Sequence, residues 1–419
     1  MKFVRMKHFL IGLWLTSPAW LMAQNLDQNI LNVQADIQQV ESQKKMLESR
    51  LENLKLQRVQ RDLRDVGLPS QNYILHTAMA LEYAEAHEQA KWVAHIITPD
   101  VIDGKVFRSN DFRPDPKVTT GSAVEEDYFL KFLQADSSYK YDGYGYDRGH
   151  LAPSADFRWS QKALSESYFY SNMSPQRPKF NRESWADLET SLRGYVFDHP
   201  TVQLYVVTGP ILSDQLPKVD RSVNKLSIPE SYFKVALDLE NKRAIGFVMP
   251  NKANPDPLST FAVTVNEVEK LTGLDFFNAL PDDLEEGIEG GMDVKSWLPE
   301  MAKGDVDPIY APSLTPDHFN TVQAKRYQGT GQEINVCGTV VSTRYSRSGN
   351  LWLNVDKQFP NQIFSVFIRK KDLPNFSYKA DEVLANTAAC FLGKVEDFNG
   401  TPTMNVGREE SIKTEVPIK

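Results

Sequence analysis

An unbroken heptad pattern dominates the amino-terminal part of the chain. Between Leu26 and Arg58 there is neither glycine nor proline, and apolar residues recur at alternating spacings of four and three. The seam consists of Leu26, Ile30, Val33, Ile37, Val40, Leu47, Leu51 and Leu54, with Lys44 and Arg58 at two further positions. This spacing predicts one long helix with a narrow apolar stripe, assigned to residues 24–66. Because such a helix is marginal alone, the stripe needs a partner. We expect a homo-oligomeric coiled coil through residues 26–58; the alternative is a helix folded back on the main domain.

The residues before this helix are typical of an export signal. Lys2, Arg5 and Lys7 precede an apolar run, Phe9–Ala23, as in a secretory signal peptide. The run of about 15 residues is short for a membrane span, which needs about 20. We therefore expect cleavage after Ala23 and an exported protein, periplasmic or secreted, with no stable membrane span after cleavage. An uncleaved amino-terminal anchor is the alternative.

Composition limits what the rest of the chain can be. A length of 419 residues predicts more than one domain. Two cysteines exclude a disulfide scaffold and a cysteine-rich zinc site. The formal net charge of −8 argues against nucleic-acid binding by bulk charge, so any such binding requires a local basic site.

Residues 67–300 mix helical and strand-like patterns. Ala78–Val93 reads as a helix that leads into a strand near Trp92–Ile97. Apolar runs and alternation predict further strands at Val202–Thr208, Tyr232–Leu239 and Arg243–Met249. The order indicates an α+β domain with a largely antiparallel sheet.

Chemically capable residues concentrate between Tyr146 and Glu189. One box reads Asp147-Arg148-Gly149-His150, and a second reads Ser171-Asn172-Met173-Ser174-Pro175-Gln176. Histidine is suited to act as a general base near neutral pH. An adjacent arginine supplies a fixed positive charge for a phosphate.

A third box runs from Asn181 through Trp185 to Glu189. If a helix begins at Asn181, these three side chains lie within about 80° of one another. An asparagine oxygen suits Mg²⁺, which keeps most of its waters, and a carboxylate then follows two turns on. Each residue alone is weak evidence, because asparagine at a helix start is usually a cap and Trp185 is expected to pack in the core. Base, hydrated cation and guanidinium together are the parts needed for phosphodiester hydrolysis.

The boxes together resemble the DNA/RNA non-specific endonuclease family, the ββα-metal or His-Me finger nucleases. The resemblance covers roughly Ile74–Leu298 and includes two later segments, Val207–Pro210 and Ile228–Lys234. It implies a ββα-metal nuclease domain that hydrolyses the phosphodiester bonds of DNA and RNA with little sequence preference. It also implies Mg²⁺ as cofactor, with Mn²⁺ or another divalent cation as alternatives.

The resemblance implies a role for each residue of the boxes. His150 would be the general base that activates a water, and Asn181 the sole direct protein ligand of the metal. Glu189 would hold metal-bound waters, Asn172 would support the site near His150, and Arg148 would bind the phosphate. In-line attack would leave 5′-phosphate ends.

A further phosphate-binding arginine is expected upstream, where the sequence offers Arg108 and Arg113. Arg108 is preferred and Arg113 is the alternative. The alternative hypothesis, from another functional class, is a nucleic-acid or protein-binding scaffold whose nuclease domain is inactive or inhibited.

The carboxyl-terminal residues 329–419 read as a second module, after a proline-rich linker at 301–328 with a short helix near Asp317–Arg326. Strands are predicted at Glu333–Ser342, Leu351–Val355, Ile363–Ile368, Cys390–Val395 and Thr403–Val406. A helix-like stretch, Lys371–Leu384, separates the third strand from the fourth, so the order suggests a small OB-like β-barrel.

OB barrels often bind single strands through aromatic and basic side chains. The candidates are Tyr345, Arg347, Trp352, Phe359, Phe364, Phe367 and Arg369; the alternative is that most of these aromatics form the barrel core. Cys337 and Cys390 fall on neighbouring predicted strands, as either a disulfide or two buried thiols. The histidines outside the boxes lack ligand-like spacing and are expected to be structural or at the surface: His76, His87, His95, His199 and His318.

Overall fold

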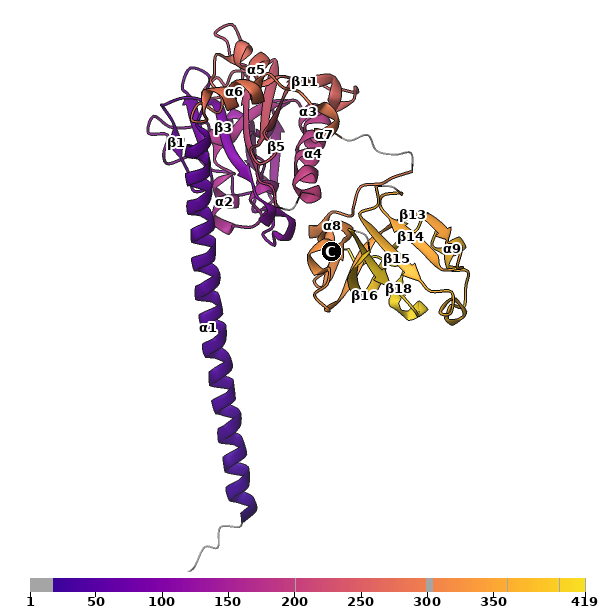
Figure 1. Ribbon diagram of the computed structural model, residues 1–419. Coiled ribbons are helices and arrows are strands. Elements are labelled where there is room, and N and C mark those ends of the chain that lie inside the picture. Colours follow the sequence, from indigo (N-terminus) through magenta and orange to yellow (C-terminus); the bar gives the residue numbers. More distant parts are fainter. Residues whose placement is uncertain (1–17, 200, 299–303, 360, 399, 419) are drawn as a thin grey trace, which may run out of the picture. The chain divides into compact units, whose positions relative to one another are not determined.

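The computed structural model describes residues 18–199, 201–298, 304–359, 361–398 and 400–418 (Figure 1). The chain divides into two compact units, Met1–Arg58 and Val59–Lys419. The predicted signal peptide at residues 1–23 falls mostly outside this description. Among the described residues, no helix combines the length and the apolar character needed to cross a membrane.

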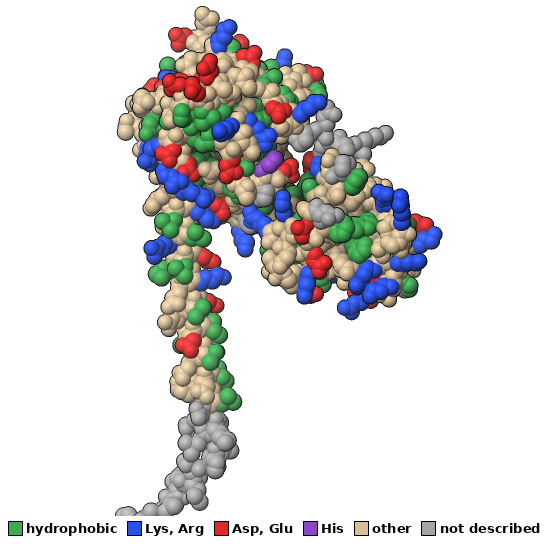
Figure 2. Space-filling view, in the orientation of Figure 1, with side chains coloured by type: hydrophobic (Ala, Val, Ile, Leu, Met, Phe, Trp, Pro, Cys, Tyr) green, Lys and Arg blue, Asp and Glu red, His purple; other side chains and the backbone are tan. Residues whose placement is uncertain are grey.

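Helix α1 runs from Pro18 to Val66. The predicted heptad seam lies along its exposed part: Leu26 is 62% exposed, and even Ile30 keeps 48% of its surface in solvent. Figure 2 shows hydrophobic side chains repeated along this helix. The last turns differ, because Val59, Leu63 and Val66 are buried and belong to the second unit. The predicted long helix is therefore present, with an apolar stripe that faces solvent.

An antiparallel seven-stranded sheet forms the centre of the part of the chain from Ile74 to Val263, in the order β1-β2-β3-β8-β9-β10-β11; several of its strands are labelled in Figure 1. All of its pairings are antiparallel. The strands are β1 (Ile74–Leu75), β2 (Met79–Ala84), β3 (Gln89–Ile97), β8 (Leu204–Pro210), β9 (Ser231–Asp238), β10 (Arg243–Pro250) and β11 (Ala262–Val263). The mixed α+β class with an antiparallel sheet is confirmed, and the strands predicted after residue 200 correspond to β8, β9 and β10.

The helix predicted at Ala78–Val93 is wrong, because this segment forms strand β2, a turn and the start of β3. Its alanines, leucine and glutamates favour a helix, but helix propensity is a weak preference that tertiary context overrides. Residues 79–82 are buried on both sides of the strand, between β1 and β3. The turn into β3 includes Glu88 with φ of 54°.

Helices cover both faces of the sheet. On β9, Tyr232 contacts Phe180 and Trp185, which belong to α3 (Pro178–Arg182) and α4 (Ser184–Asp198). The next residue, Phe233, points to the opposite face and packs against Phe276, as the alternation of a strand requires. That face is covered by α5 (Val265–Thr272) and α6 (Asp282–Glu289), and α7 (Val294–Trp297) packs on α4.

Two small antiparallel strand pairs complete this part of the chain. Strands β4 (Phe129–Leu133) and β5 (Tyr139–Gly143) form one antiparallel pair. Strands β6 (Asp147–His150) and β7 (Met173–Gln176) form the other, with α2 (Gln161–Glu166) between them in the chain. Because α3 follows β7 directly, the histidine box lies on the first strand of a strand–strand–helix unit.

The carboxyl-terminal residues form a second seven-stranded sheet, in the order β12-β13-β14-β15-β17-β16-β18. An additional β13–β16 pairing closes five of these strands into a ring. The ring strands are β13 (Glu333–Tyr345), β14 (Leu351–Val355), β15 (Phe364–Ile368), β16 (Ala388–Phe398) and β17 (Thr401–Asn405). Each corresponds to a predicted strand, and Cys337 and Cys390 face one another across β13 and β16 in a disulfide.

The helix predicted near Asp317–Arg326 is largely wrong. His318–Asn320 form strand β12, which pairs in parallel with β13, and only Thr321–Ala324 form helix α8. Asp317 has φ of 68°, outside the helical region, and the side chain of Asn320 caps α8. Similarly, only Ala380–Val383 (α9) of the helix-like Lys371–Leu384 stretch is α-helical, and β18 (Ile412–Lys413) was not predicted.

Candidate active site

The β6–β7 pair holds the histidine box against the main sheet. In its register Asp147 faces Gln176 and His150 faces Met173. Gly149 is required here because a Cβ atom at this position would collide with the buried side chain of Gln176. The glycine of the box thus allows close packing of the strand that carries His150.

His150 lies half-buried among aromatic rings. Its ring meets Tyr168 edge-on at a centroid distance of 5.0 Å, and Phe112 lies at 5.7 Å. Its Nε2 atom is buried and has no hydrogen-bond partner within the described residues. Burial, with the charges of Arg108 and Arg148, lowers the pKa of His150 to about 3. The imidazole is therefore neutral at pH 7, the form in which one ring nitrogen carries a free lone pair.

Asn172 fixes the chain immediately after His150. Its Oδ1 accepts from the amide of Ala152 at 2.9 Å, and its Nδ2 donates to the carbonyls of Ala152 and Ser167 at 2.9 and 2.7 Å. The side chain is fully buried. Asn172 is thus placed to brace the backbone of the histidine box.

Asp147 connects the histidine strand to helix α3. Its carboxylate accepts from Asn181 Nδ2 at 2.9 Å and from Arg182 Nε and Nη2 at 2.8 and 2.7 Å. The bond to Asn181 uses the amide nitrogen, so the amide oxygen is the atom that can act as a ligand. Asp147 therefore orients Asn181 relative to the strand of His150.

The single helix predicted to begin at Asn181 is wrong. Asn181 lies inside α3, which starts at Pro178, and Glu183 separates α3 from α4 with φ of −112° and ψ of −102°. Proline favours the first turn of a helix, which accounts for the earlier start. Asn181 and Glu189 consequently come from two helices. Trp185, on α4, is buried as expected.

Arg148 and Arg108 both act on His150 through their charge. The Arg148 guanidinium lies 3.6 Å from the centroid of Phe112 and 5.0 Å from that of Phe129. Arg108 is exposed and donates from Nε to the Tyr168 hydroxyl at 3.2 Å. Both guanidinium charges thus lie close enough to the imidazole to oppose its protonation.

Arg113 has a different environment. Its Nη1 donates to the carboxylate of Asp111 at 2.8 Å and to the carbonyl of Ser165 at 3.0 Å, and its guanidinium lies over Phe169. Through these contacts Arg113 stabilises the loop to which it belongs. The structure therefore favours Arg108 of the two candidate arginines.

Glu189 lies beside a buried group of charges that sequence reasoning missed. Burial raises the pKa of Glu189, while Lys234 and Arg193 oppose that shift. Lys234 is 1% exposed and donates to Thr208 Oγ1 at 2.7 Å, and burial lowers the pKa of its ammonium. The available signal was a lysine at a core-facing position in the alternating pattern of β9.

Asp156 completes this group. It accepts from His95 Nε2 and from Arg193 Nη1, each at 2.8 Å. Burial alone would raise the pKa of Asp156, but Arg193 and His95 hold it below its usual value. His95 and Asp156 thus form a buried polar support beneath the site, in agreement with a structural role for His95.

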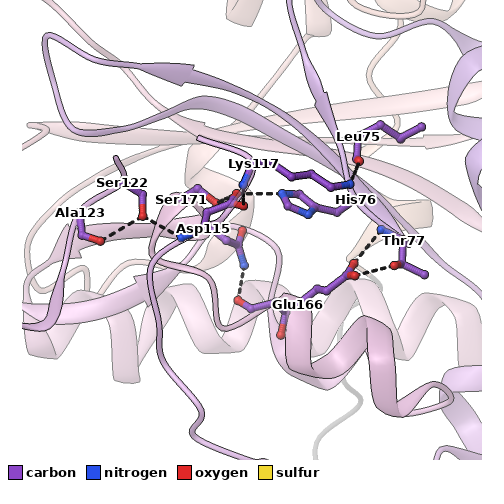
Figure 3. Close-up of polar contacts among 11 residues, drawn as sticks. Leu75, His76, Thr77, Asp115, Lys117, Ser122, Ala123, Glu166 and Ser171 are labelled. Carbon is purple, nitrogen blue, oxygen red and sulfur yellow. Dashed lines mark hydrogen bonds and ion pairs between the residues drawn. The ribbon is translucent and has the colours of Figure 1, made fainter. Parts of the chain in front are cut away.

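A second buried histidine, His76, supports the segment that leads into Asn172. Its Nε2 and the hydroxyl of Ser171 both contact Asp115 Oδ2, at 2.9 and 2.6 Å (Figure 3). Glu166 joins the same region by accepting from the amide and hydroxyl of Thr77. His76 and Ser171 are therefore structural, while Asn172 faces the histidine box.

The donor set suits a hydrated hard cation. The described residues contain no group of three or more His, Cys, Asp or Glu side chains able to hold a metal ion. What they offer is the amide oxygen of Asn181 and the half-buried carboxylate of Glu189. Oxygen donors in small number suit Mg²⁺, which keeps several waters when a protein binds it.

Comparison with known proteins agrees with this chemistry. The sequence profile of the family described as DNA/RNA non-specific endonuclease matches residues 60–283, more than half of the chain. A nuclease of Nostoc sp. is 31% identical over 240 residues, which cover 54% of this chain and 81% of that protein. Nuclease C1 of Cunninghamella echinulata var. echinulata is 32% identical over 227 residues, covering 50% and 84%. Mitochondrial endonuclease G of Bos taurus is 30% identical over 233 residues, covering 51% and 72%.

Proposed function

The chain belongs to the DNA/RNA non-specific endonuclease family, and we propose that it is an exported, Mg²⁺-dependent member in which His150 is the general base. The family membership makes it a metal-dependent endonuclease that hydrolyses phosphodiester bonds. The observation that supports the finer proposal is the placement of His150 on β6, half-buried against Tyr168 and Phe112, with the backbone that follows it held by Asn172.

His150 takes the proton of the attacking water. A proton on Nε2 would be buried without an acceptor within the described residues, and this favours the neutral ring. The Asn172 bonds hold the backbone after His150 and keep the imidazole aligned for in-line attack, which leaves a 5′-phosphate end.

Arg108 and Arg148 bind the phosphate and stabilise its charge in the transition state. Asn181, oriented by Asp147, would hold the cation directly, and Glu189 would hold its waters. When bound, Mg²⁺ neutralises charge on the phosphate and on the leaving 3′ oxygen; Mn²⁺ or another divalent cation can replace it.

The test is cleavage of supercoiled plasmid and of single-stranded RNA by the mature protein. It is run with Mg²⁺, with EDTA, and with His150→Ala beside wild type. His318→Ala is the matched control, because His318 lies on β12, which pairs with the carboxyl-terminal strand β13 and is outside residues 67–300. Cleavage of both substrates that requires Mg²⁺ and His150, but not His318, is expected.

The net charge of −8 favours one other function. A nuclease with little positive surface binds its substrate weakly at moderate salt. The alternative is therefore a binding scaffold whose nuclease domain is inactive or inhibited. Failure of wild type to cut either substrate across divalent metals at low salt would make that alternative the leading one.

The exposed stripe of α1 supports a coiled coil between copies of the chain. Stripe residues such as Val40 and Leu47 are 62% and 58% exposed, and sustained heptads of this kind associate in water. A Val40→Lys/Leu47→Lys protein should have a lower molar mass by light scattering than wild type. Gln38→Lys, off the seam, should not; equal masses for all three would remove the proposal.

We assign residues 329–419 to an OB-like module that binds single strands, and residues 67–300 to the nuclease domain. The closed ring of five strands supports the first assignment. Trp352 lies 4.7 Å from Phe367 and 4.8 Å from Phe398, between ring centroids. Of the predicted aromatics, Phe364 is in the core, while Tyr345 and Phe359 are exposed. Trp352→Ala should weaken binding to single-stranded DNA more than Phe359→Ala does.

Export rests on the sequence of residues 1–23. The Cys337–Cys390 disulfide supports it, because such bonds persist in oxidising compartments. Intact-mass measurement of protein purified from periplasm or medium should give a chain that begins at Gln24. A full-length chain retained in the cytoplasm would contradict export.

A further inference from the structure

The β4–β5 hairpin presents aromatic side chains to solvent close to Arg148. In its register Phe129 faces Gly143, Lys131 faces Tyr141, and Leu133 faces Tyr139. Residues directly opposite one another in an antiparallel pair share a face of the ribbon. We call Phe129, Lys131, Tyr139, Tyr141 and Gly143 the aromatic face. Tyr139 and Tyr141 are 50% and 54% exposed.

This face continues directly from the phosphate-binding arginine. The Arg148 guanidinium lies 5.0 Å from the centroid of Phe129, and Phe129 meets Tyr141 edge-on at 5.2 Å. The ammonium of Lys131 lies 4.5 Å from the ring centroid of Tyr139 and 5.9 Å from that of Tyr141. An unbroken series of ring and cation contacts therefore leads outward from Arg148, two residues from His150.

A pocket of about 460 Å³ lies against the aromatic face. Asn110, Glu125 and Arg148 line it together with residues of the face. A Cβ atom added to Gly143 would meet nothing within 4 Å, so the strand leaves open space there.

The pocket chemistry suits a base better than a second phosphate. The carboxylate of Glu125 lies 3.7 Å from Lys131 Nζ and would repel a phosphate group. Carboxylate and amide side chains such as Glu125 and Asn110 hydrogen-bond to the edges of bases. Tyrosine rings stack on any base, so the contact tolerates sequence.

We propose that the aromatic face is a nucleobase subsite, which holds a base of the substrate strand next to the phosphate bound by Arg148. The inference rests on the proposed function and specifies how that site binds its substrate. It also explains how a nuclease with a negative net charge can bind nucleic acid. Stacking contributes affinity that does not depend on a positively charged surface.

The opposite face of the same hairpin supplies a matched control. Phe132 pairs with Lys140 on that face and is 48% exposed, close to the exposure of Tyr141. Neighbouring Asp142 is held there by Arg221 at 2.7 Å. Loss of an exposed ring from either face of the hairpin should affect folding similarly. Only a loss from the aromatic face should weaken binding of the nucleic acid.

The experiment measures binding in EDTA, so that no substrate is cut. The probes are fluorescent oligothymidylate and an abasic deoxyribose-phosphate polymer of the same length, which keeps the phosphates and lacks the bases. The proteins are wild type, Tyr141→Ala, Gly143→Val and Phe132→Ala. Binding by the carboxyl-terminal module is common to all four, so differences among them report on the hairpin.

Tyr141→Ala should weaken oligothymidylate binding by about tenfold, within the range for loss of one base stack. Gly143→Val should do the same by filling the pocket. Neither change should alter abasic-polymer binding, and Phe132→Ala should alter neither. Equal loss for both polymers, or equal loss in Phe132→Ala, would overturn the subsite.

Plasmid cleavage by the same proteins separates the two proposals. If wild type fails to cut but Tyr141 still distinguishes the polymers, the subsite stands and the proposed function fails. If cleavage requires His150 but Tyr141→Ala and Gly143→Val bind both polymers as wild type does, the subsite fails and the proposed function stands.

Discussion

Substitution of Asp147 tests whether this residue orients Asn181. The test is possible because the Asp147 carboxylate makes two contacts that can be removed separately. It orients Asn181 through a 2.9 Å bond and binds Arg182 through two bonds. Asp147→Ala removes both contacts, whereas Arg182→Ala removes only the second. Comparison of the two variants therefore isolates the orientation of Asn181.

The contribution of each contact to stability follows from how exposed its partner side chain is. The Arg182 side chain is 69% exposed, so its pair with Asp147 contributes about 0–1 kcal/mol to folding. The bond to half-buried Asn181 adds about 0.5–1.5 kcal/mol. Asp147→Ala should therefore cost about 1–2 kcal/mol of stability and leave the protein folded. Loss of a group that orients a metal ligand weakens metal affinity by about 10- to 100-fold.

The assay is the initial rate of plasmid nicking as a function of Mg²⁺ concentration. Asp147→Ala should raise the half-saturating Mg²⁺ concentration by about tenfold or more, with much of the rate recovered at high Mg²⁺. Arg182→Ala should keep the wild-type concentration, and thermal melting checks that both variants are folded. A wild-type Mg²⁺ requirement in Asp147→Ala, or an equal shift in Arg182→Ala, would refute this account of Asn181.

Three further predictions concern pH, the arginines and the disulfide. Burial raises the pKa of Glu189, and Mg²⁺ competes with the proton on this carboxyl group. The acid limb of the pH profile of kcat/KM should therefore move to lower pH as the Mg²⁺ concentration increases. A limb fixed near pH 6.5 would instead show that the catalytic histidine itself titrates. Arg108→Ala should lower kcat/KM by about 10²- to 10³-fold, whereas Arg113→Ala should mainly lower the melting temperature; the reverse pattern would exchange their roles. Replacing Cys337 and Cys390 by alanine opens a loop with a sequence separation of 53, which costs about 4 kcal/mol in the chain-entropy relation. Proteolysis of the carboxyl-terminal module in urea should report this loss while plasmid nicking in native buffer is retained.

Elements with strong local periodicity could be predicted from the sequence. The heptad seam predicted α1, and the alternating or apolar runs after residue 200 predicted β8, β9 and β10. The ring strands of the carboxyl-terminal module were also found, because hairpin signals separate them. The helix prediction for Ala78–Val93 failed because strand pairing on both sides of β2 holds these helix-forming residues in a sheet. That pairing is a property of the sheet and not of the segment.

Candidate site residues could be proposed from the sequence where they lie in dense local motifs, and their roles stay predictions. His150, Asn172 and Asn181 could be named because each lies in such a motif. The sequence alone does not distinguish Arg108 from Arg113, because their different contacts, with Tyr168 and with Asp111, form only in the folded chain. The group formed by His95, Asp156, Arg193 and Lys234 escaped prediction because its members come from separate elements that meet only in the folded chain.

The central claim is that His150 supplies the base for phosphodiester hydrolysis. It is tested most directly by the single-turnover rate of plasmid nicking in saturating Mg²⁺, for wild type and His150→Ala. His150→Ala should nick plasmid about 10²- to 10⁴-fold more slowly than wild type, with a wild-type melting temperature and wild-type oligonucleotide binding. A His150→Ala protein that nicks plasmid at close to the wild-type rate would contradict it.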